Sequence, residues 1–184
     1  MDSGAESYMR FLNGNNDAIV EIIRDYKDGL ILYLRSFTDD IYHAEELAED
    51  TFVKLVTNRP RFGNKSSFKT WLYAIGRNVA LDQLRKRKKH REVSYDACAE
   101  LAEESSLECT YLREEQKIRL RKALMQLKPE YRQILWLIYF EGFSNKEAAD
   151  VMKRSTHSVE TLVYRARLAL KKQLEMEGFH YERI

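Results

Sequence analysis

Ten Lys and Arg residues lie between Arg61 and Arg91, against the single acid Asp82, and aromatic residues are interleaved with them. Lysine and arginine neutralise nucleic-acid phosphates, and aromatic rings stack on bases that have left the duplex. The segment therefore has the chemistry of a nucleic-acid surface. Two other interpretations compete with this one. The aromatic residues alone are typical of a core helix with a solvated basic tail, and the Lys-Arg run alone is typical of a non-specific basic patch.

The same segment has the periodicity of a helix. Its apolar positions follow the spacing of one buried face: Phe68, Leu72, Ile75 and Val79. Trp71, Asn78 and Arg85 recur every seven residues and fall on a neighbouring stripe. This stripe combines an aromatic ring, an amide and a cation, which together suit an unpaired strand of nucleic acid.

A second basic element begins at Ser144, which forms a capping-box pattern with Glu147. The pattern predicts a short helix over 145–152, a turn over 153–155 and a longer helix over 156–175. A short helix, a tight turn and a helix with a polar outer face describe a helix-turn-helix, whose second helix enters the major groove. By geometry alone an ordinary helical hairpin is equally compatible. The cationic flanks favour the DNA-binding motif: Arg154, Arg165, Arg167, Lys171 and Lys172.

The composition favours helices, because the 184 residues include two prolines and seven glycines. The net charge of +2 conceals a segregation of charge, since residues 92–116 hold eight acids and one base. We therefore expect an all-α protein of two small helical domains. An N-terminal bundle would span 1–91, a flexible acidic linker 92–113, and a four-helix helix-turn-helix domain 114–184.

Turn and cap signals divide the two expected domains into helices. In the first we expect a short helix near 5–12, a second that Asp17 caps, and a third over 41–57 with one acidic side. In the second, a helix ends at Leu127 and Pro129 suits the first turn of the next. That helix, over 130–140, is densely apolar and should form the core, and Gly142 ends it.

Several classes of protein are disfavoured. Cys98 and Cys109 lack the partners of a zinc site, and we interpret them as two reduced thiols in a linker. Four scattered His and the lack of a glycine-rich phosphate loop argue against an enzyme acting on nucleic acid, so we expect no catalytic residues, no metal and no cofactor. The longest apolar run, 134–140, is far short of a membrane span, and no signal peptide is evident. We expect a cytoplasmic protein without membrane insertion.

Three motifs in order resemble the extracytoplasmic-function class of bacterial RNA polymerase sigma factors. AEELAEDTFVKL (44–55) resembles the family's polymerase-binding helix. SFKTWLYAIGRNVALDQLRKRKK (67–89) is similar to its promoter-melting segment. LKPEYRQILWLIYFEGFSNKEAADVMKRSTHSVETLVYRARLALKK (127–172) resembles its C-terminal promoter-binding domain. The motifs cover most of the chain, in family order, with a family-like acidic linker between them.

The resemblance implies a factor that binds core RNA polymerase, at the clamp helices of the largest subunit and the flap of the second-largest, and promoter DNA. An anti-sigma factor would be a further partner. Residues implied to bind polymerase are Leu47, Glu49, Asp50, Phe52 and Leu55. Residues implied to capture the melted −10 element are Asn64, Lys65, Ser66, Ser67, Phe68, Trp71, Asn78, Arg85, Lys86 and Arg87. Residues implied to contact the −35 duplex are Arg154, Ser155, Thr156, His157, Glu160, Thr161, Tyr164, Arg165 and Arg167.

The recognition helix departs from the family pattern. Lys153 occupies a turn position that is often Gly in the family, and Glu160 and Leu162 stand where Lys and Arg are common. The promoter sequence therefore cannot be transferred from relatives. The alternative function is a helix-turn-helix regulator that binds duplex DNA without polymerase. Such a regulator would have no use for an aromatic single-strand platform beside an acidic docking helix.

Overall fold

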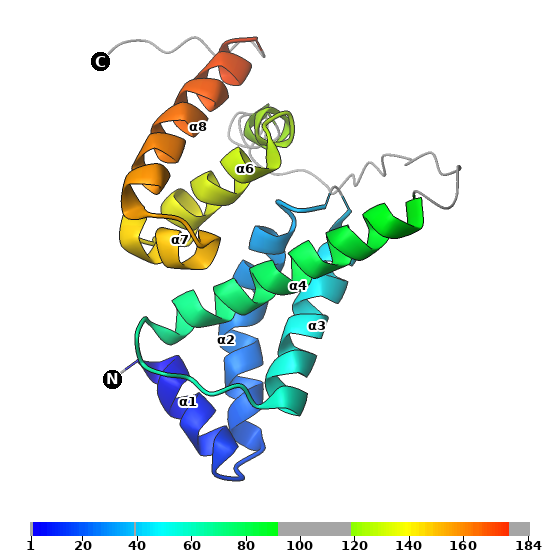
Figure 1. The fold of residues 1–184 in the computed structure, drawn as a ribbon, viewed down its shortest axis with the longest axis vertical. Coiled ribbons are helices and arrows are strands. Elements are labelled where there is room, and N and C mark those ends of the chain that lie inside the picture. Colours follow the sequence, from blue (N-terminus) through cyan, green and yellow to red (C-terminus); the bar gives the residue numbers. More distant parts are fainter. Residues whose placement is uncertain (1, 39, 92–118, 177–184) are drawn as a thin grey trace, which may run out of the picture.

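The computed structural model describes residues 2–38, 40–91 and 119–176, and these form helices and no strand. The expected linker at 92–113 lies outside the described residues. Helices α1 (Ser3–Leu12), α2 (Asp17–Leu34), α3 (Ile41–Asn58) and α4 (Phe68–Arg91) form a first unit, in which α2 packs on each of the other three (Figure 1). No helix in the described ranges is long and apolar enough to cross a membrane.

The second unit consists of residues 119–125, which are helical, α6 (Pro129–Leu135), η1 (Trp136–Phe140), α7 (Asn145–Met152) and α8 (Thr156–Met176). Helix α8 packs on α6 and α7. The expected helix over 130–140 is confirmed as a helical segment, but its last five residues form a π-helical turn that the periodicity did not predict. Gly142 ends the segment with a φ of 71°, as expected.

Local capping explains most helix starts. Asp40 accepts from the Tyr42 N–H at 3.1 Å and begins α3, and Pro129 lies in the first turn of α6. The prediction that Asp17 caps α2 is wrong. Asp17 is the first residue of the helix, and Asn15 Oδ1 accepts from the Asp17 N–H at 3.1 Å instead.

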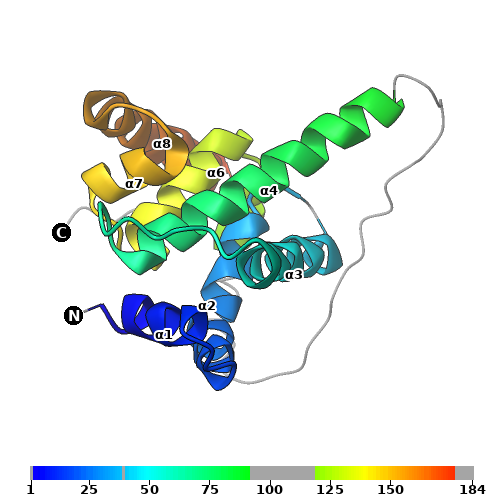
Figure 2. The same cartoon turned by 60° about the horizontal axis from the view of Figure 1, so that its bottom comes forward.

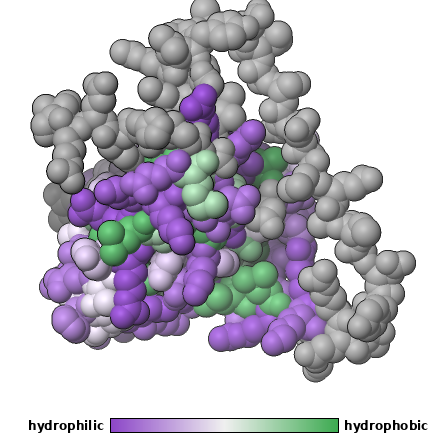
Figure 3. All heavy atoms as spheres, turned by 90° about the horizontal axis from the view of Figure 1, so that it is seen from above, coloured by the Kyte–Doolittle hydropathy of each residue, from purple (hydrophilic) through white to green (hydrophobic). Residues whose placement is uncertain are grey.

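Helix α4 links the two units. It packs on α2, α3 and α7, and contacts with α3 continue to Gln83 and Arg87. Its last turns extend beyond the other helices in both views (Figures 1 and 2). The molecular face in Figure 3 is mostly hydrophilic, with small hydrophobic areas between the charged side chains. The helix predicted to be central therefore carries its basic end into solvent.

Candidate nucleic-acid interface

The aromatic side chains at the start of α4 form one cluster with α1 and the preceding loop. Trp71 is half-buried, and its ring centroid lies 5.2 Å from Tyr8, 5.2 Å from Phe62 and 5.5 Å from Phe68. Phe68 has no exposed surface, because Tyr8, Tyr26 and Phe62 surround it. A nucleic-acid base could therefore contact the ring of Trp71 but not that of Phe68. The Phe68 ring instead packs against Trp71 from the interior of the protein.

Helix α1 supports this cluster, a role that sequence reasoning missed. Tyr8 Oη donates to the Pro60 carbonyl at 2.7 Å, which fixes the loop before α4. Burial raises the pKa of Tyr8 to about 12, an effect that the Arg59 guanidinium partly offsets. The Asp2 carboxylate accepts from the Gly4 N–H at 3.1 Å and also from the Phe68 N–H, so one side chain caps both α1 and α4. In the sequence, the acidic residue at position 2 was the only sign that one side chain could cap these helices.

The loop before α4 presents polar side chains next to Trp71. Asn64 and Lys65 are exposed, and Asn64 has a φ of 52°, a left-handed conformation that Asn tolerates. Ser66 and Ser67 are half-buried. Ser67 Oγ accepts from the Thr70 N–H at 3.2 Å and begins the helix. The loop and the aromatic cluster thus lie at one end of α4.

The remaining predicted −10 residues follow α4 toward its free end. Asn78 is half-buried, and Arg85, Lys86 and Arg87 are exposed. Arg85 pairs with Asp82 at 3.1 Å and remains largely solvated. Arg87 Nη1 lies 3.2 Å from His43 Nδ1. Trp71 and Arg85 are fourteen residues apart, or about 21 Å along the axis. The stripe therefore offers a ring at one end and cations at the other.

The polymerase-binding surface predicted on α3 has the expected acidic residues at its surface, but not the expected apolar ones. Glu49 and Asp50 are exposed, and Asp50 accepts from Gln83 at 2.9 Å. The three apolar residues assigned to polymerase binding are instead buried in the core: Leu47, Phe52 and Leu55. The exposed large hydrophobic residues of α3 are Tyr42, near its start, and Val53 and Val56. The two valines lie four and seven positions after Glu49, on the same side of the helix.

The second unit contains the predicted helix-turn-helix. Ser144 Oγ accepts from the Glu147 N–H at 3.2 Å and Glu147 accepts from the Ser144 N–H at 2.9 Å, which completes the capping box and begins α7. The backbone N–H of Ser144 is the main cause of a lowered pKa of Glu147. Lys153 ends α7 with a φ of 53°, a left-handed conformation that glycine adopts most readily.

Helix α8 presents one face of its first three turns to solvent. Arg154 pairs with Glu130 at 2.7 Å, and His157 Nδ1 lies 3.9 Å from the Glu160 carboxylate. Thr161 is half-buried, and all other predicted −35 residues are exposed: Arg154, Ser155, Thr156, His157, Glu160, Tyr164, Arg165 and Arg167. Leu162 is buried. It therefore belongs to the core, and the departure from the family pattern at this position does not concern the exposed face.

Metal chemistry has no support in the described ranges, where no three His, Cys, Asp or Glu side chains gather as ligands. The arrangement instead offers two surfaces suited to nucleic acid. One is the ring, loop and basic helix end of the first unit, and the other is the exposed N-terminal half of α8.

Two family models match the chain, in the order of the two units. Sigma-70 region 2 matches residues 22–90 and Sigma-70, region 4 matches residues 117–170. The chain is 32% identical over 167 residues to the RNA polymerase sigma factor YlaC of Bacillus subtilis, covering 87% of this chain and 94% of that protein. It is 27% identical to the ECF RNA polymerase sigma factor SigW of the same organism, covering 88% and 91%.

Solved structures agree with these matches. The sigma factor RpoE of Bartonella quintana, crystallised with the anti-sigma factor NepR, superposes with a TM-score of 0.70 at 26% identity, covering 84% of this chain and 95% of that one. CnrH, in complex with the cytosolic domain of CnrY, shares the fold with a TM-score of 0.65 at 24% identity, over 95% and 96% of the two chains. The chain belongs to the sigma-70 family of RNA polymerase sigma factors, the factors of promoter-specific transcription initiation, and to its extracytoplasmic-function class.

Proposed function

We propose that this chain is a non-catalytic cytoplasmic subunit that binds core RNA polymerase, captures the melted −10 element with its first unit and contacts the −35 duplex with its second. The observation that carries the proposal is the half-buried Trp71, which is fixed on three other rings at the start of a helix whose far end is basic. Unstacking a base costs a few kcal/mol, and stacking on an aromatic ring recovers about 1–3 kcal/mol.

In the −10 site, Trp71 supplies the stacking surface, and the buried Phe68 ring packs against Trp71 and fixes its position. Asn64, Lys65, Ser66 and Ser67 form the polar wall beside the ring. Asn78 provides an amide hydrogen-bonding group further along, and Arg85, Lys86 and Arg87 neutralise phosphates of the DNA that leads away from the ring. The order of these groups along α4 suits a strand that leaves a duplex at one end.

In the −35 site, α8 enters the major groove with its N-terminal half. The groups that face the DNA are Arg154, Ser155, Thr156, His157, Glu160, Thr161, Tyr164, Arg165 and Arg167. Glu160 accepts a hydrogen bond from cytosine N4. A carboxylate repels phosphates but can report base identity, so Glu160 is assigned to specificity rather than to affinity.

The polymerase-binding surface is assigned to the exposed side of α3, with Glu49 and Asp50 flanked by Val53 and Val56. This differs from the initial prediction, because Leu47, Phe52 and Leu55 fill the core and can act only by supporting the helix. The clamp helices of the largest subunit are the proposed partner of this surface. The flap of the second-largest subunit is the proposed partner of the second unit, which exposes Tyr139 and Phe140.

An anti-sigma factor is a further proposed partner. The similar sigma factor RpoE was solved in complex with the anti-sigma factor NepR, and CnrH, which shares the fold, was solved in complex with the cytosolic domain of CnrY. The competing function is a regulator that binds duplex DNA without polymerase. It accounts for the second unit and leaves the aromatic cluster and the acidic helix of the first without a role.

The test of polymerase binding is co-elution of the full chain with sigma-free core enzyme. Asp50→Arg combined with Val53→Asp should abolish co-elution, because it reverses a charge and places a carboxylate on an apolar surface. The matched control is Asp28→Arg with Val20→Asp, which makes the same changes at exposed positions of α2. Equal binding by both double variants would rule out the α3 surface, and lack of binding by the wild type would favour the regulator.

A further inference from the structure

Helix α1 contacts the beginning of the loop 59–67, which joins α3 to α4 (Figure 1). Tyr8 Oη donates to the Pro60 carbonyl at 2.7 Å. The Arg59 guanidinium lies 5.1 Å from the centre of the Phe11 ring, within the range of a cation–π contact. Tyr8 and Phe11 are each at most 2% exposed, so both contacts start from side chains that packing holds in place. The first two residues of the loop therefore rest on α1.

The same helix also contacts the end of the loop. Asp2, its N-cap, accepts from the Gly4 N–H at 3.1 Å and from the N–H of Phe68, where α4 begins. Gly4 permits this close approach, because a Cβ there would lie 2.5 Å from Phe68 Cδ1 and 2.5 Å from Tyr26 Oη. One short helix with its cap residue therefore holds the loop at both ends.

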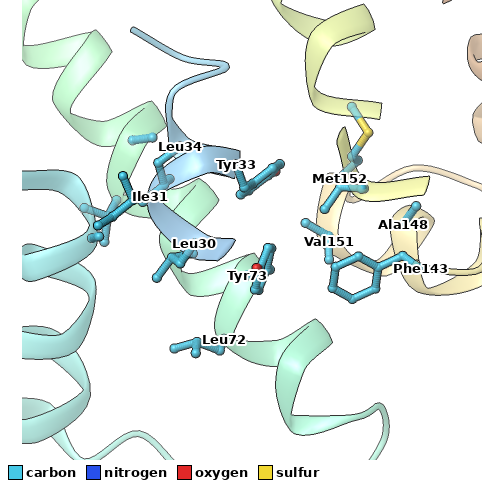
Figure 4. Close-up of a cluster of buried hydrophobic side chains, with 14 of the residues drawn as sticks. Leu30, Ile31, Tyr33, Leu34, Leu72, Tyr73, Phe143, Ala148, Val151 and Met152 are labelled. Carbon is cyan, nitrogen blue, oxygen red and sulfur yellow. The ribbon is translucent and has the colours of Figure 1, made fainter. Parts of the chain in front are cut away.

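The elements on either side of the loop are themselves fixed. Helix α1 is anchored on α2, because Ser7 Oγ donates to Glu21 at 2.8 Å and Arg10 pairs with the same carboxylate. The start of α4 is anchored on α2 as well, since Leu72 and Leu30 belong to one buried cluster and neither is exposed (Figure 4). The loop is therefore the part of the −10 site whose position depends most on α1.

The backbone of the loop needs such support. Arg59 and Asn64 have φ values of 43° and 52°, in the left-handed region. Residues other than glycine stay in this region only where their surroundings hold them. A loop without these contacts would sample other conformations and would have to be ordered when DNA binds, at a cost in affinity. The match to Sigma-70 region 2 begins at residue 22, so α1 lies outside the matched range.

We propose that α1 is a positioning element of the −10 site, in which Asp2 and Tyr8 hold the loop 59–67 in its strand-receiving conformation before DNA arrives. Tyr8 has no exposed surface, so it acts through the loop and not on DNA. The rigidity of the loop is a property of the free chain. Its effect on strand capture rests on the proposed function.

The positioning role is tested first by the mobility of the loop in the free, full chain. Nitrogen-15 relaxation should give order parameters of about 0.85 for the amides of residues 61–67 in wild type, as for rigid backbone. Tyr8→Phe removes only the hydroxyl and should lower these values toward about 0.6. Tyr33→Phe is the matched control and should match wild type, because Tyr33 is equally buried and its hydroxyl has no hydrogen-bond partner among the described residues.

Asp2→Ala is the second variant, and it should loosen the other end of the loop. Its control is Asp40→Ala, which removes one acid and the N-cap of α3, where Asp40 accepts from the Tyr42 N–H at 3.1 Å. Three outcomes would overturn the positioning role. These are wild-type order parameters below about 0.6, unchanged values in both Tyr8→Phe and Asp2→Ala, and equal decreases in the variants and their controls.

The consequence for DNA is tested with reconstituted holoenzyme and a fluorescent single-stranded −10 oligonucleotide from a mapped promoter. Tyr8→Phe should raise the Kd roughly two- to tenfold, because losing one hydrogen bond lowers the population of the held loop and affinity falls with that population. Affinity for core polymerase and for a −35-only duplex should change less than about twofold. A residue that acted only through the stability of the first unit would lower core binding as well.

Equal oligonucleotide affinities of Tyr8→Phe and Tyr33→Phe would overturn the link between the loop and strand capture. If wild-type holoenzyme binds no single strand at all, the proposed −10 function fails. The order parameters then still decide whether α1 holds the loop.

Discussion

Replacing Trp71 by alanine tests the single-strand platform. The ring lies on Tyr8, Phe62 and Phe68 with centroid distances of 5.2, 5.2 and 5.5 Å, so its position is fixed before DNA arrives. Stacking contributes about 1–3 kcal/mol per base. Because about 1.4 kcal/mol corresponds to a factor of ten, Trp71→Ala should reduce promoter opening roughly 5- to 150-fold.

The substitution also removes packing, so a matched variant is needed. Full truncation of a buried Trp costs about 3–5 kcal/mol of unfolding free energy, and for this half-buried side chain we expect about 2 kcal/mol. Trp71→Phe retains a ring in the cluster and should open promoters within several-fold of wild type. Recovery by Trp71→Phe would therefore assign the loss to the missing aromatic ring, and the core-binding measurement separates lost stacking from lost packing.

Opening is measured by permanganate reactivity of thymines in reconstituted complexes, and core binding by titration of labelled protein against core polymerase. We expect a selective loss of opening, with core affinity changed less than about twofold. Normal opening by Trp71→Ala would refute the platform. An equal loss of core binding and opening would show that the residue acts only through the stability of the first unit.

Three further predictions concern the basic end, the turn and the cap. Replacing Lys86, Arg87 and Lys88 by alanine should reduce the salt slope of DNA binding by up to about 2–3, measured by anisotropy titration; an unchanged slope would show a solvated tail that contacts no phosphates. Lys153→Gly should raise the unfolding free energy by about 0.5–1 kcal/mol in urea titrations, because a side chain at a φ of 53° is strained; lower stability would contradict this. The lowered pKa of Glu147 implies stability that is present above the usual value of 4.5 and lost as pH falls through the folded value. The unfolding free energy of wild type should therefore exceed that of Glu147→Gln by about 0.5–1 kcal/mol at pH 7. If the same difference in unfolding free energy remained at pH 3, the charge of Glu147 would not be its cause.

Local signals in the sequence were sufficient for most of the helices, including the short helix, turn and long helix of the second unit, but not for the π-helical turn at 136–140. The capping box at Ser144, the proline at 129 and the glycine at 142 each act within one turn of the chain, and all three are found where the sequence placed them. The periodicity of α4 likewise predicted the burial of Phe68 and Leu72.

The assignment of exposed faces was less successful, because it depends on packing between distant segments. Helix α3 carries apolar residues on two sides, and only the positions of α2 and α4 decide that Leu47 and Phe52 are buried while Val53 is 56% exposed. The contact of Glu141 with α4 joins residues about seventy positions apart, and no local pattern predicts it.

The central claim is that this chain directs core polymerase to promoters with two spaced elements. The most direct test is transcription with purified chain and sigma-free core polymerase on a pool of promoter-bearing fragments, with transcript 5′ ends mapped. The account predicts discrete start sites that share two upstream elements, one near −10 and one near −35. Absence of initiation and of core binding, together with protection of duplex DNA by the chain alone, would contradict it and identify a regulator instead.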